Sequence, residues 1–496
     1  MTSFPNTIDF AGLNQPVGIE CSHHDLVVEG AIPDDVRGTF YRAVPDPVFP
    51  PLFEDDTALS GDGMISKLDF RADGGVDFDL RYVRTARYEA EQAAGRALFG
   101  RYRNPFTDIA EARGVDRTVA NTTPVWHAGK LLMSKEDGRA YRIDPDTLAT
   151  IGSHDFDGAL KSETMTAHVR IDPVTGEMFF FGYEADGIAS TKVSYCIADA
   201  EGRLVREQWF DGPYCSMMHD FAITEHYALF PVFPTTASRA RIEAGGAHWI
   251  HEPELASWVG IMPRYGDVSE MRWFEGPRGV SVYHMMNAFE DGAGGVHLDQ
   301  CLSSTNAFPF IQRASGISIA PWEMKSGLTR WSFDMNGSGP GSGPGTGIAE
   351  RPLGPPGDFP RIADADQGRP YHHGWYCTMN PEVKGPPIVG GPVGAMFNML
   401  LRIEPETGRL DALPLPPAHC LNEPVHVPSQ TPGHEGWLIM IVDHQTGAND
   451  FAHAAWIVDA GKIAAGPVAK IHIPARLRPQ VHGWWVSAAQ RAEALS

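Results

Sequence analysis

Apolar residues in this chain fall mostly into short runs of strand length that are bounded by turn-forming residues. One such run is EMFFFGY at 177–183. Another is SVYHMMNAFE at 281–290, which leads into the acid-and-glycine turn EDGAGG. Short apolar runs between Gly, Pro and Asp clusters are typical of β-strands and tight turns. The pattern therefore predicts an all-β chain built from strand–turn–strand units.

A short internal echo indicates that such units repeat. YRIDPDT at 141–147, VRIDPVTG at 169–176 and LRIEPETG at 401–408 share the pattern Arg-Ile-acid-Pro-x-Thr. Each predicts a short strand that enters a Pro-containing turn and is followed by another strand. Repetition of this kind over several hundred residues favours a β-propeller. Seven blades would average about 71 residues each, which leaves room for insertions.

Two stretches depart from the strand pattern. Residues 87–114 are rich in Ala, Glu and Arg and predict helix, and residues 238–260 are similar but broken by Gly and Pro. We place cap insertions around 86–115 and 236–262, mainly helix and loop, over one face of the propeller. The low-complexity segment NGSGPGSGPGTG predicts a flexible loop around 336–347. No linker separates independent domains, so the whole chain, 1–496, is predicted to form one.

Composition excludes several classes of function. With 43% hydrophobic residues the chain can fill a core, and its 52 Gly and 40 Pro fit a turn-rich β protein. A net charge of −22 without a basic stripe argues against nucleic acid and against anionic membranes. The N-terminus lacks the pattern of a secretory signal, and no apolar run is long enough to predict a membrane span. Six scattered cysteines without a CxxC suit reduced thiols, so we expect a soluble cytoplasmic protein.

Three histidines occupy comparable places in successive strand–turn–strand units. His168, His219 and His284 are 51 and 65 residues apart, about one blade each. Because the inner strands of a propeller surround its axis, these imidazoles would converge, and imidazole suits Zn, Cu, Fe and Ni. The simpler alternative is that they are unrelated strand histidines among the 20 in the chain. The flanks of His482, in PQVHGWWV, do not follow the same pattern, so spacing alone gives it little weight.

Motifs along nearly the whole chain resemble those of the carotenoid cleavage oxygenase family, and within it the bacterial lignostilbene-α,β-dioxygenases. They include SGDGM, FGRYRNPFTD, KEDGRAYRIDP, AHVRIDPVTGE, MHDFAIT, WVGIMPRYG, YHMMNAFE, DFPRI, NEPVHVP and HGWWV, in this order. The resemblance implies a seven-bladed β-propeller with a mainly helical and loop cap over the face that carries the active site. It also implies a non-haem Fe(II) held by four histidines, which map onto His168, His219, His284 and His482.

The resemblance further implies acidic partners for the ligating histidines. Glu136 and Glu423 match two such positions, and the third falls on Asp358, where glutamate is expected before FPRI. A carboxylate at such a position holds one ring nitrogen while the other faces the metal. Because Asp358 is one methylene shorter, its direct bond to a histidine is in question. Thr122 aligns with a threonine whose side chain partly obstructs one open iron position in family members. The simpler alternative is a threonine that satisfies a strand or turn.

Substrate recognition is implied by Tyr102 and Lys135, which in the stilbene-cleaving subfamily contact a phenolic oxygen. Physically, an ammonium and a phenolic hydroxyl can stabilise a phenolate in a cavity of low dielectric constant. The simpler alternatives are a core aromatic and a surface lysine.

The chain departs from the subfamily just before GDGM, where an aromatic side chain is usual. It has Leu59 and Ser60 there, which would alter the stacking of the substrate ring. Phe308 and Phe310 could supply apolar lining of the pocket elsewhere.

The leading hypothesis is an Fe(II)- and O2-dependent dioxygenase that cleaves the central double bond of 4-hydroxystilbenes into two aromatic aldehydes, without an organic cofactor. The main alternative is an apocarotenoid-cleaving dioxygenase with the same iron site. Two remoter alternatives are a non-catalytic propeller that serves as a binding scaffold and a zinc hydrolase built on the same histidines. The oligomeric state is left open, with a homodimer as one option.

Overall fold

The computed structural model describes residues 3–314, 326–337 and 348–494. Most of the loop predicted at 336–347 lies outside these residues. The chain forms two compact units. Unit 1 comprises Met1–His154, Trp375–Arg402 and Leu410–Ser496, and unit 2 comprises Asp155–Gly374 and Ile403–Arg409.

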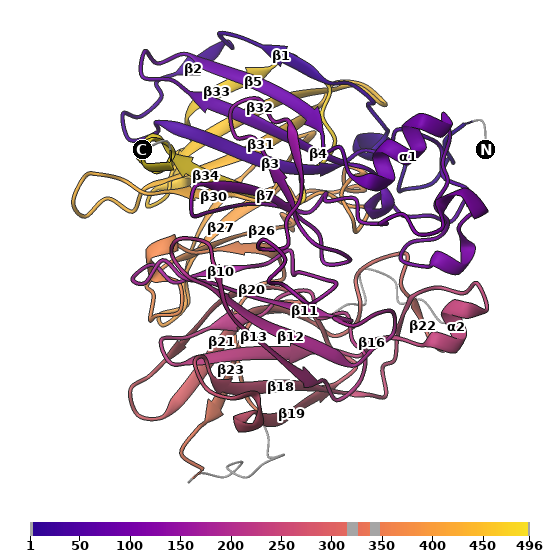
Figure 1. Ribbon diagram of the computed structural model, residues 1–496. Coiled ribbons are helices and arrows are strands. Elements are labelled where there is room, and N and C mark those ends of the chain that lie inside the picture. Colours follow the sequence, from indigo (N-terminus) through magenta and orange to yellow (C-terminus); the bar gives the residue numbers. More distant parts are fainter. Residues whose placement is uncertain (1–2, 315–325, 338–347, 495–496) are drawn as a thin grey trace. The chain divides into compact units, whose positions relative to one another are not determined.

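Unit 1 is built on antiparallel sheets (Figure 1). Its strands are β1 Cys21–His23, β2 Val28–Gly30, β3 Gly38–Pro45, β4 Gly63–Phe70, β5 Val76–Tyr82, β6 Thr123–His127, β7 Lys130–Ser134, β8 Tyr141–Ile143, β9 Thr150–Ser153, β29 His419–Leu421, β30 Val425–Val427, β31 Trp437–Gln445, β32 Phe451–Asp459, β33 Pro467–Ile473 and β34 Gly483–Ser487. One sheet has the order β1-β5-β4-β3-β34 and another the order β6-β7-β8-β9. A third has the order β2-β33-β32-β31-β29, with β30 also paired to β31.

Strands that are far apart in the sequence pair with each other in unit 1. Figure 1 shows β34, close to the C-terminus, beside β3, and the register pairs Phe40 with Trp485. In the neighbouring sheet β2, close to the N-terminus, pairs with β33. Buried side chains of both sheets, among them Phe40, Leu68, Ile439 and Ile457, pack into one apolar cluster. Each of these sheets therefore joins strands that lie far apart in the sequence.

Unit 2 repeats a four-stranded antiparallel sheet along the chain. Its strands are β10 Arg170–Ile171, β11 Met178–Tyr183, β12 Lys192–Ala198, β13 Leu204–Asp211, β14 Ala222–Ile223, β15 Tyr227–Val232, β16 Thr235–Ala237, β17 Trp249–His251, β18 Ala256–Pro263, β19 Arg272–Arg278, β20 Ser281–Glu290, β21 Gly295–Ser303, β22 Gln312–Arg313, β23 Ser326–Asp334, β24 Ala349–Gly354 and β25 Asp358–Arg361. The sheets have the orders β10-β11-β12-β13, β14-β15-β18-β19 and β20-β21-β23-β24. A small sheet adds β16-β17-β22. Strands β26 Gly374–Thr378, β27 Met399–Glu404 and β28 Arg409–Pro414 lie where the chain passes between the units.

Helices are few and short among the described residues. The α-helices are α1 Ala86–Ala94, α2 Arg239–Glu243 and α3 Ala488–Ala494, and the 3-10 turns are η1 Gly12–Asn14, η2 Ala58–Ser60, η3 Pro105–Thr107, η4 Ala110–Ala112, η5 Val268–Glu270, η7 Asp364–Asp366 and η8 Ile463–Ala465. Helix α1 begins where the Thr85 side chain accepts a hydrogen bond from the Tyr88 amide, and it ends at Gly95, whose φ of 65° is left-handed. The mostly β content agrees with the predicted all-β class.

The prediction of helix over 87–114 holds only for its first turns, which belong to α1. The prediction over 238–260 was largely wrong, because α2 covers only five residues. The Gly245–Gly246 pair follows it, and the aromatic and β-branched residues beyond form β17 and β18 instead.

The strand–turn–strand predictions are confirmed. The echoed motifs form β8, β10 and β27, each followed by a turn and the next strand. Asp144 accepts a hydrogen bond from the Thr147 amide at 2.8 Å, and Asp172 accepts one from the Val174 amide at 2.8 Å. In both motifs the aspartate side chain thus accepts a hydrogen bond from a backbone amide of the turn that it begins.

All six cysteines are free, as their scattered spacing predicts. None of the helices among the described residues has the length and apolar character that a membrane span requires.

Candidate metal and substrate site

Three of the predicted histidines lie at equivalent places in unit 2. His168 comes just before β10, His219 just before β14, and His284 lies within β20. Each of these strands is the first strand of its four-stranded sheet. The three side chains therefore come from corresponding edges of successive sheets, as the spacing in the sequence predicts.

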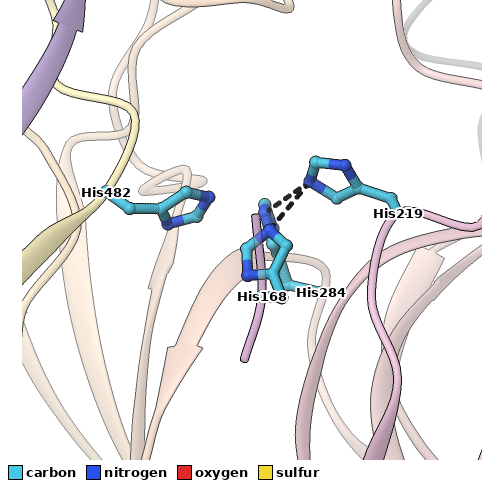
Figure 2. Close-up of side chains that lie close together, drawn as sticks. All are labelled: His168, His219, His284 and His482. Carbon is cyan, nitrogen blue, oxygen red and sulfur yellow. Dashed lines mark hydrogen bonds between the residues drawn. The ribbon is translucent and has the colours of Figure 1, made fainter. Parts of the chain in front are cut away.

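The three imidazole rings converge (Figure 2). The Nε2 atom of His219 lies 3.1 Å from that of His168 and 3.3 Å from that of His284. One ligand nitrogen from each ring lies within 4.8 Å of the others. His284 is buried, and His168 and His219 are half-buried.

Local backbone geometry aims His284 at its neighbours. The register between β20 and β21 shifts on both sides of Met285, so that Tyr283 and His284 fall in a bulge. Bulges re-aim side chains in this way beside active sites. The ring of Phe359 stacks on His284 at 5.1 Å, although Phe359 has a φ of 55°. A left-handed aromatic residue is a strained conformation, and here it places a ring against a candidate ligand.

Asp358 fixes the ring nitrogen of His284 that faces away from the cluster. Its Oδ1 atom lies 2.8 Å from His284 Nδ1. Because a carboxylate only accepts hydrogen bonds, the Nδ1–H donates, and in the neutral ring Nε2 then carries a lone pair. The shorter aspartate thus reaches its histidine directly.

The geometry of the cluster fits a metal ion. Two imidazole nitrogens bound at about 2.0–2.1 Å to one ion, at angles of about 90–110°, lie about 2.8–3.4 Å apart. The two measured spacings, 3.1 and 3.3 Å, fall in this range. Lone pairs at such distances repel one another unless a cation or a proton lies between them. Neutral imidazole is a ligand for iron as well as for zinc, copper and nickel.

His482, drawn with the three rings in Figure 2, belongs to unit 1. It comes just before β34, the edge strand of its sheet, and is buried. Its Nδ1–H donates to Glu423 Oε1 at 3.0 Å, and the other carboxylate oxygen accepts a hydrogen bond from the Gly483 amide at 2.8 Å. Within its own unit, His482 thus has the same kind of acidic partner as His284.

The predicted substrate pair, Tyr102 and Lys135, is also brought together in unit 1. The Lys135 ammonium lies 5.2 Å from the centre of the Tyr102 ring. It donates hydrogen bonds to the Leu59 carbonyl at 3.1 Å and to Asn121 Oδ1 at 3.3 Å. Lys135 is only 2% exposed, so it is not a surface lysine.

Burial shifts the pKa values of Tyr102 and Lys135 in opposite directions. It raises the pKa of the Tyr102 hydroxyl well above its ordinary value, and the Glu136 carboxylate raises it further. It lowers the pKa of Lys135, against the opposing charges of Asp137 and Glu136. Tyr102 therefore stays protonated at neutral pH and can donate its proton in a hydrogen bond.

The remaining predicted residues are buried, except for Phe310, which is half-buried. Glu136 directly follows Lys135, and the Thr122 hydroxyl donates to Asn121 Oδ1 at 3.0 Å. The Ser60 hydroxyl donates to Asp56 at 2.7 Å. In unit 2, the ring of Phe308 lies 4.1 Å from that of Tyr283, the neighbour of His284, and 5.3 Å from that of Phe310.

Asn121 is a part of the site that the sequence analysis missed. Its side-chain amide donates to the Leu59 carbonyl at 3.0 Å and to the Gly61 carbonyl at 2.8 Å, while its oxygen accepts from Lys135 and Thr122. Asn121 thus joins the loop before GDGM to the predicted phenol site. Its place beside Thr122 was the only signal, because a single Asn in a loop carries no motif.

Comparison with known proteins agrees with this arrangement. Residues 14–487 match the protein family described as retinal pigment epithelial membrane protein. Lignostilbene-α,β-dioxygenase isozyme III of Sphingomonas paucimobilis is 39% identical over 99% of both chains. Isoeugenol monooxygenase of Pseudomonas nitroreducens is 38% identical over 97% of this chain and 98% of its own. The crystal structure of Pseudomonas brassicacearum lignostilbene dioxygenase superposes with a TM-score of 0.92 at 36% identity, over 98% of this chain and 100% of that one.

The chain belongs to the retinal pigment epithelial membrane protein family, the carotenoid cleavage oxygenases, as its motifs predict. It is an oxygenase, in a family whose members cleave double bonds with O2 and depend on iron. Its mostly β structure matches the propeller fold of that family.

The contact between Asp358 and His284 makes a direct prediction for metal binding. The Asp358→Asn change keeps the shape of the side chain but removes the charge that orients the imidazole. We expect the dissociation constant for Fe(II) or Co(II) to rise by about 10–100-fold, as for other partners of ligating histidines. Metal titration under anaerobic conditions measures it. Asp364→Asn, at an exposed turn, is the matched control. Equal affinities for the two variants would contradict the prediction.

Proposed function

We propose that this protein is a non-haem Fe(II) dioxygenase that cleaves the central double bond of 4-hydroxystilbenes. The observation that carries the proposal is the pairing of two features: a converging histidine cluster and the buried Lys135–Tyr102 pair. The names of the relatives support the same class of substrate.

In this proposal His168, His219, His284 and His482 hold the iron. Asp358 orients His284, Glu423 orients His482, and Glu136 serves a third ligand. Four neutral ligands would leave positions on the iron open, and Thr122 would stand beside one of them. Bound Fe(II) would supply the activation of O2 that an organic cofactor supplies in other oxygenases.

The phenol end of the substrate is held by Lys135 and Tyr102. Among the described residues, two of the three N–H groups of Lys135 have acceptors, which leaves one to face a phenolic oxygen. The protonated Tyr102 hydroxyl donates a second hydrogen bond. In a buried site these contacts stabilise the phenolate, whose charge delocalises through the ring into the conjugated alkene.

The reaction balances without a further reductant. The C=C bond and the O–O bond break, and each former alkene carbon takes one oxygen atom to become an aldehyde. We assign Leu59, Ser60 and Phe308 to the pocket lining. Leu59 replaces the aromatic wall usual in this subfamily, while its backbone carbonyl holds Lys135.

We further propose that the sheets are arranged as seven blades in one domain, with the insertions at 86–115 and 236–262 covering the face of the site. Seven sheets of four or more strands among the described residues, the six given above and β25-β26-β27-β28, support this arrangement. A cytoplasmic location and a homodimer stay predictions.

The function is tested with a substrate panel on Fe(II)-reconstituted protein in air: a 4-hydroxystilbene, its 4-methoxy analogue, isoeugenol and an apocarotenal. We expect two aromatic aldehydes from the hydroxystilbene and none from the methoxy analogue, which cannot form a phenolate. Mass spectrometry identifies the products. Cleavage of the apocarotenal alone would transfer the function to the carotenoid branch. Cleavage of isoeugenol alone would keep phenol recognition but overturn the stilbene assignment.

The proposed role of His482 as the fourth ligand is tested by measuring the iron content of the protein. We expect about one iron per chain in the reconstituted protein, and a large loss of iron in His482→Ala because a ligand is removed. His472→Ala, an exposed histidine in the same unit, is the control. A His482→Ala variant that retains wild-type iron content would remove His482 from the ligand set.

The role of Lys135 is tested with substitutions that remove or keep its positive charge. Lys135→Met should lower kcat/KM for the hydroxystilbene by about 10²–10³-fold, the usual cost of one stabilising donor at a developing charge. Burial lowers the pKa of Lys135, so the ammonium loses its proton at a lower pH than an exposed lysine does. We therefore expect kcat/KM to decline on the alkaline side as this charge is lost. Lys135→Arg keeps its charge at high pH and should shift the alkaline decline upward.

The control for this series is Lys130→Met, which removes a lysine from the start of β7, the strand that ends just before Lys135. An unchanged kcat/KM in Lys135→Met would end the phenolate mechanism while leaving the iron site standing.

A further inference from the structure

The three strand edges that carry the histidines of unit 2 are joined by one carboxylate. Asp220 directly follows His219. Its Oδ1 atom accepts a hydrogen bond from the Arg170 guanidinium at 2.6 Å, and Arg170 is two residues beyond His168. Its Oδ2 atom accepts one from the Met285 amide at 2.9 Å, and Met285 directly follows His284.

Further hydrogen bonds hold Arg170 and Asp220 in place. Arg170 Nε donates to the Phe221 carbonyl at 2.8 Å, so the guanidinium holds both the side chain of Asp220 and the backbone beside it. The Phe221 amide donates to Asp220 Oδ1 at 2.7 Å. The side chain of Asp220 is only 2% exposed and that of Arg170 14% exposed. A charged pair so buried is held in one geometry, because any other would leave a charge unpaired.

The hydrogen bond from the Met285 amide to Asp220 lies where the pairing of β20 is irregular. Met285 lies between the two register shifts of β20, where the ladder to β21 is irregular. A bulged strand has fewer ladder hydrogen bonds to define its path. The carboxylate supplies an acceptor for the Met285 amide there and so fixes the backbone that carries His284.

We propose that Asp220, with Arg170, is a positioning residue that sets the spacing of the three histidines, and hence the geometry and affinity of the metal site. This inference rests on the metal site proposed above. Asp220 itself contacts none of the three imidazoles in any contact described for it, so it acts through the backbone.

A second buried pair in unit 2 provides a matched comparison. Asp299 Oδ1 and Oδ2 accept hydrogen bonds from Arg330 at 2.7 and 2.8 Å, and both side chains are buried. Asp299 lies on β21 and Arg330 on β23, strands that carry none of the four histidines. Loss of this pair should lower stability without altering the metal site.

The experiment compares Asp220→Asn with Asp299→Asn in the full chain. Each variant is titrated with Co(II), whose visible absorption spectrum reports coordination geometry. The thermal unfolding midpoint is measured with and without the metal. For Asp220→Asn we expect a changed Co(II) spectrum, a dissociation constant higher by about tenfold or more, and a smaller metal-induced rise in the midpoint. For Asp299→Asn we expect a lower midpoint without metal, and an unchanged spectrum and affinity.

Arg170→Gln is the second variant, in case Asp220→Asn does not fold. It removes the guanidinium at a partly exposed position and leaves the acceptor of Met285 in place, so it should change the spectrum in the same direction. Wild-type spectrum and affinity in the folded Asp220 or Arg170 variants would overturn the inference. A wild-type protein that binds neither Co(II) nor Fe(II) would overturn the metal site itself, and the positioning role with it. Metal binding without stilbene cleavage would overturn only the substrate assignment.

Discussion

The central constraint on this structure is that imidazole nitrogens which repel one another must be held little more than 3 Å apart. Each histidine lies on or just before the first strand of its sheet, so the repeated sheets of unit 2 place the rings within reach of each other. Repetition alone does not aim them. A bulge at His284, the stacked ring of Phe359 and the carboxylate of Asp358 set the direction of one ring. The strained backbone of Phe359 is tolerated because the surrounding contacts hold it.

The proposed phenol site places a different demand on the fold, because the ammonium of Lys135 is buried away from water. Lys135 is compensated by a backbone carbonyl and an amide oxygen rather than by a directly bonded carboxylate. A carboxylate bound to the ammonium would neutralise the charge that a phenolate needs. The neighbouring acids, Glu136 and Asp137, act on Lys135 only through space in the interactions described. In the proposed function, the phenolate of the substrate would supply the negative charge that balances this buried ammonium.

Much of this arrangement could be predicted from the sequence. The apolar runs gave the strands, and the spacing of His168, His219 and His284 gave their equivalence, because both depend on local periodicity. The family motifs pointed to Asp358, Glu423, Tyr102 and Lys135, but not to whether Asp358 touches its histidine directly, which depends on a few tenths of an ångström of backbone position. Residues 238–260 were misjudged because their Ala and Glu content favours helix, whereas sheet pairing favours β17 and β18. Asn121 and Asp220 were missed since each acts by joining segments that are distant in the sequence.

The pairing of β3 with β34 has a consequence for how the protein folds. It joins residues 38–42 to residues 483–487, so this edge of the sheet depends on a contact between distant parts of the sequence. Contacts of such sequence separation form slowly, because the intervening chain must first lose much of its conformational freedom. His482 comes just before β34, so the proposed fourth ligand is fixed in place only by this late pairing. The proposed metal site would therefore be completed at the same step as that sheet.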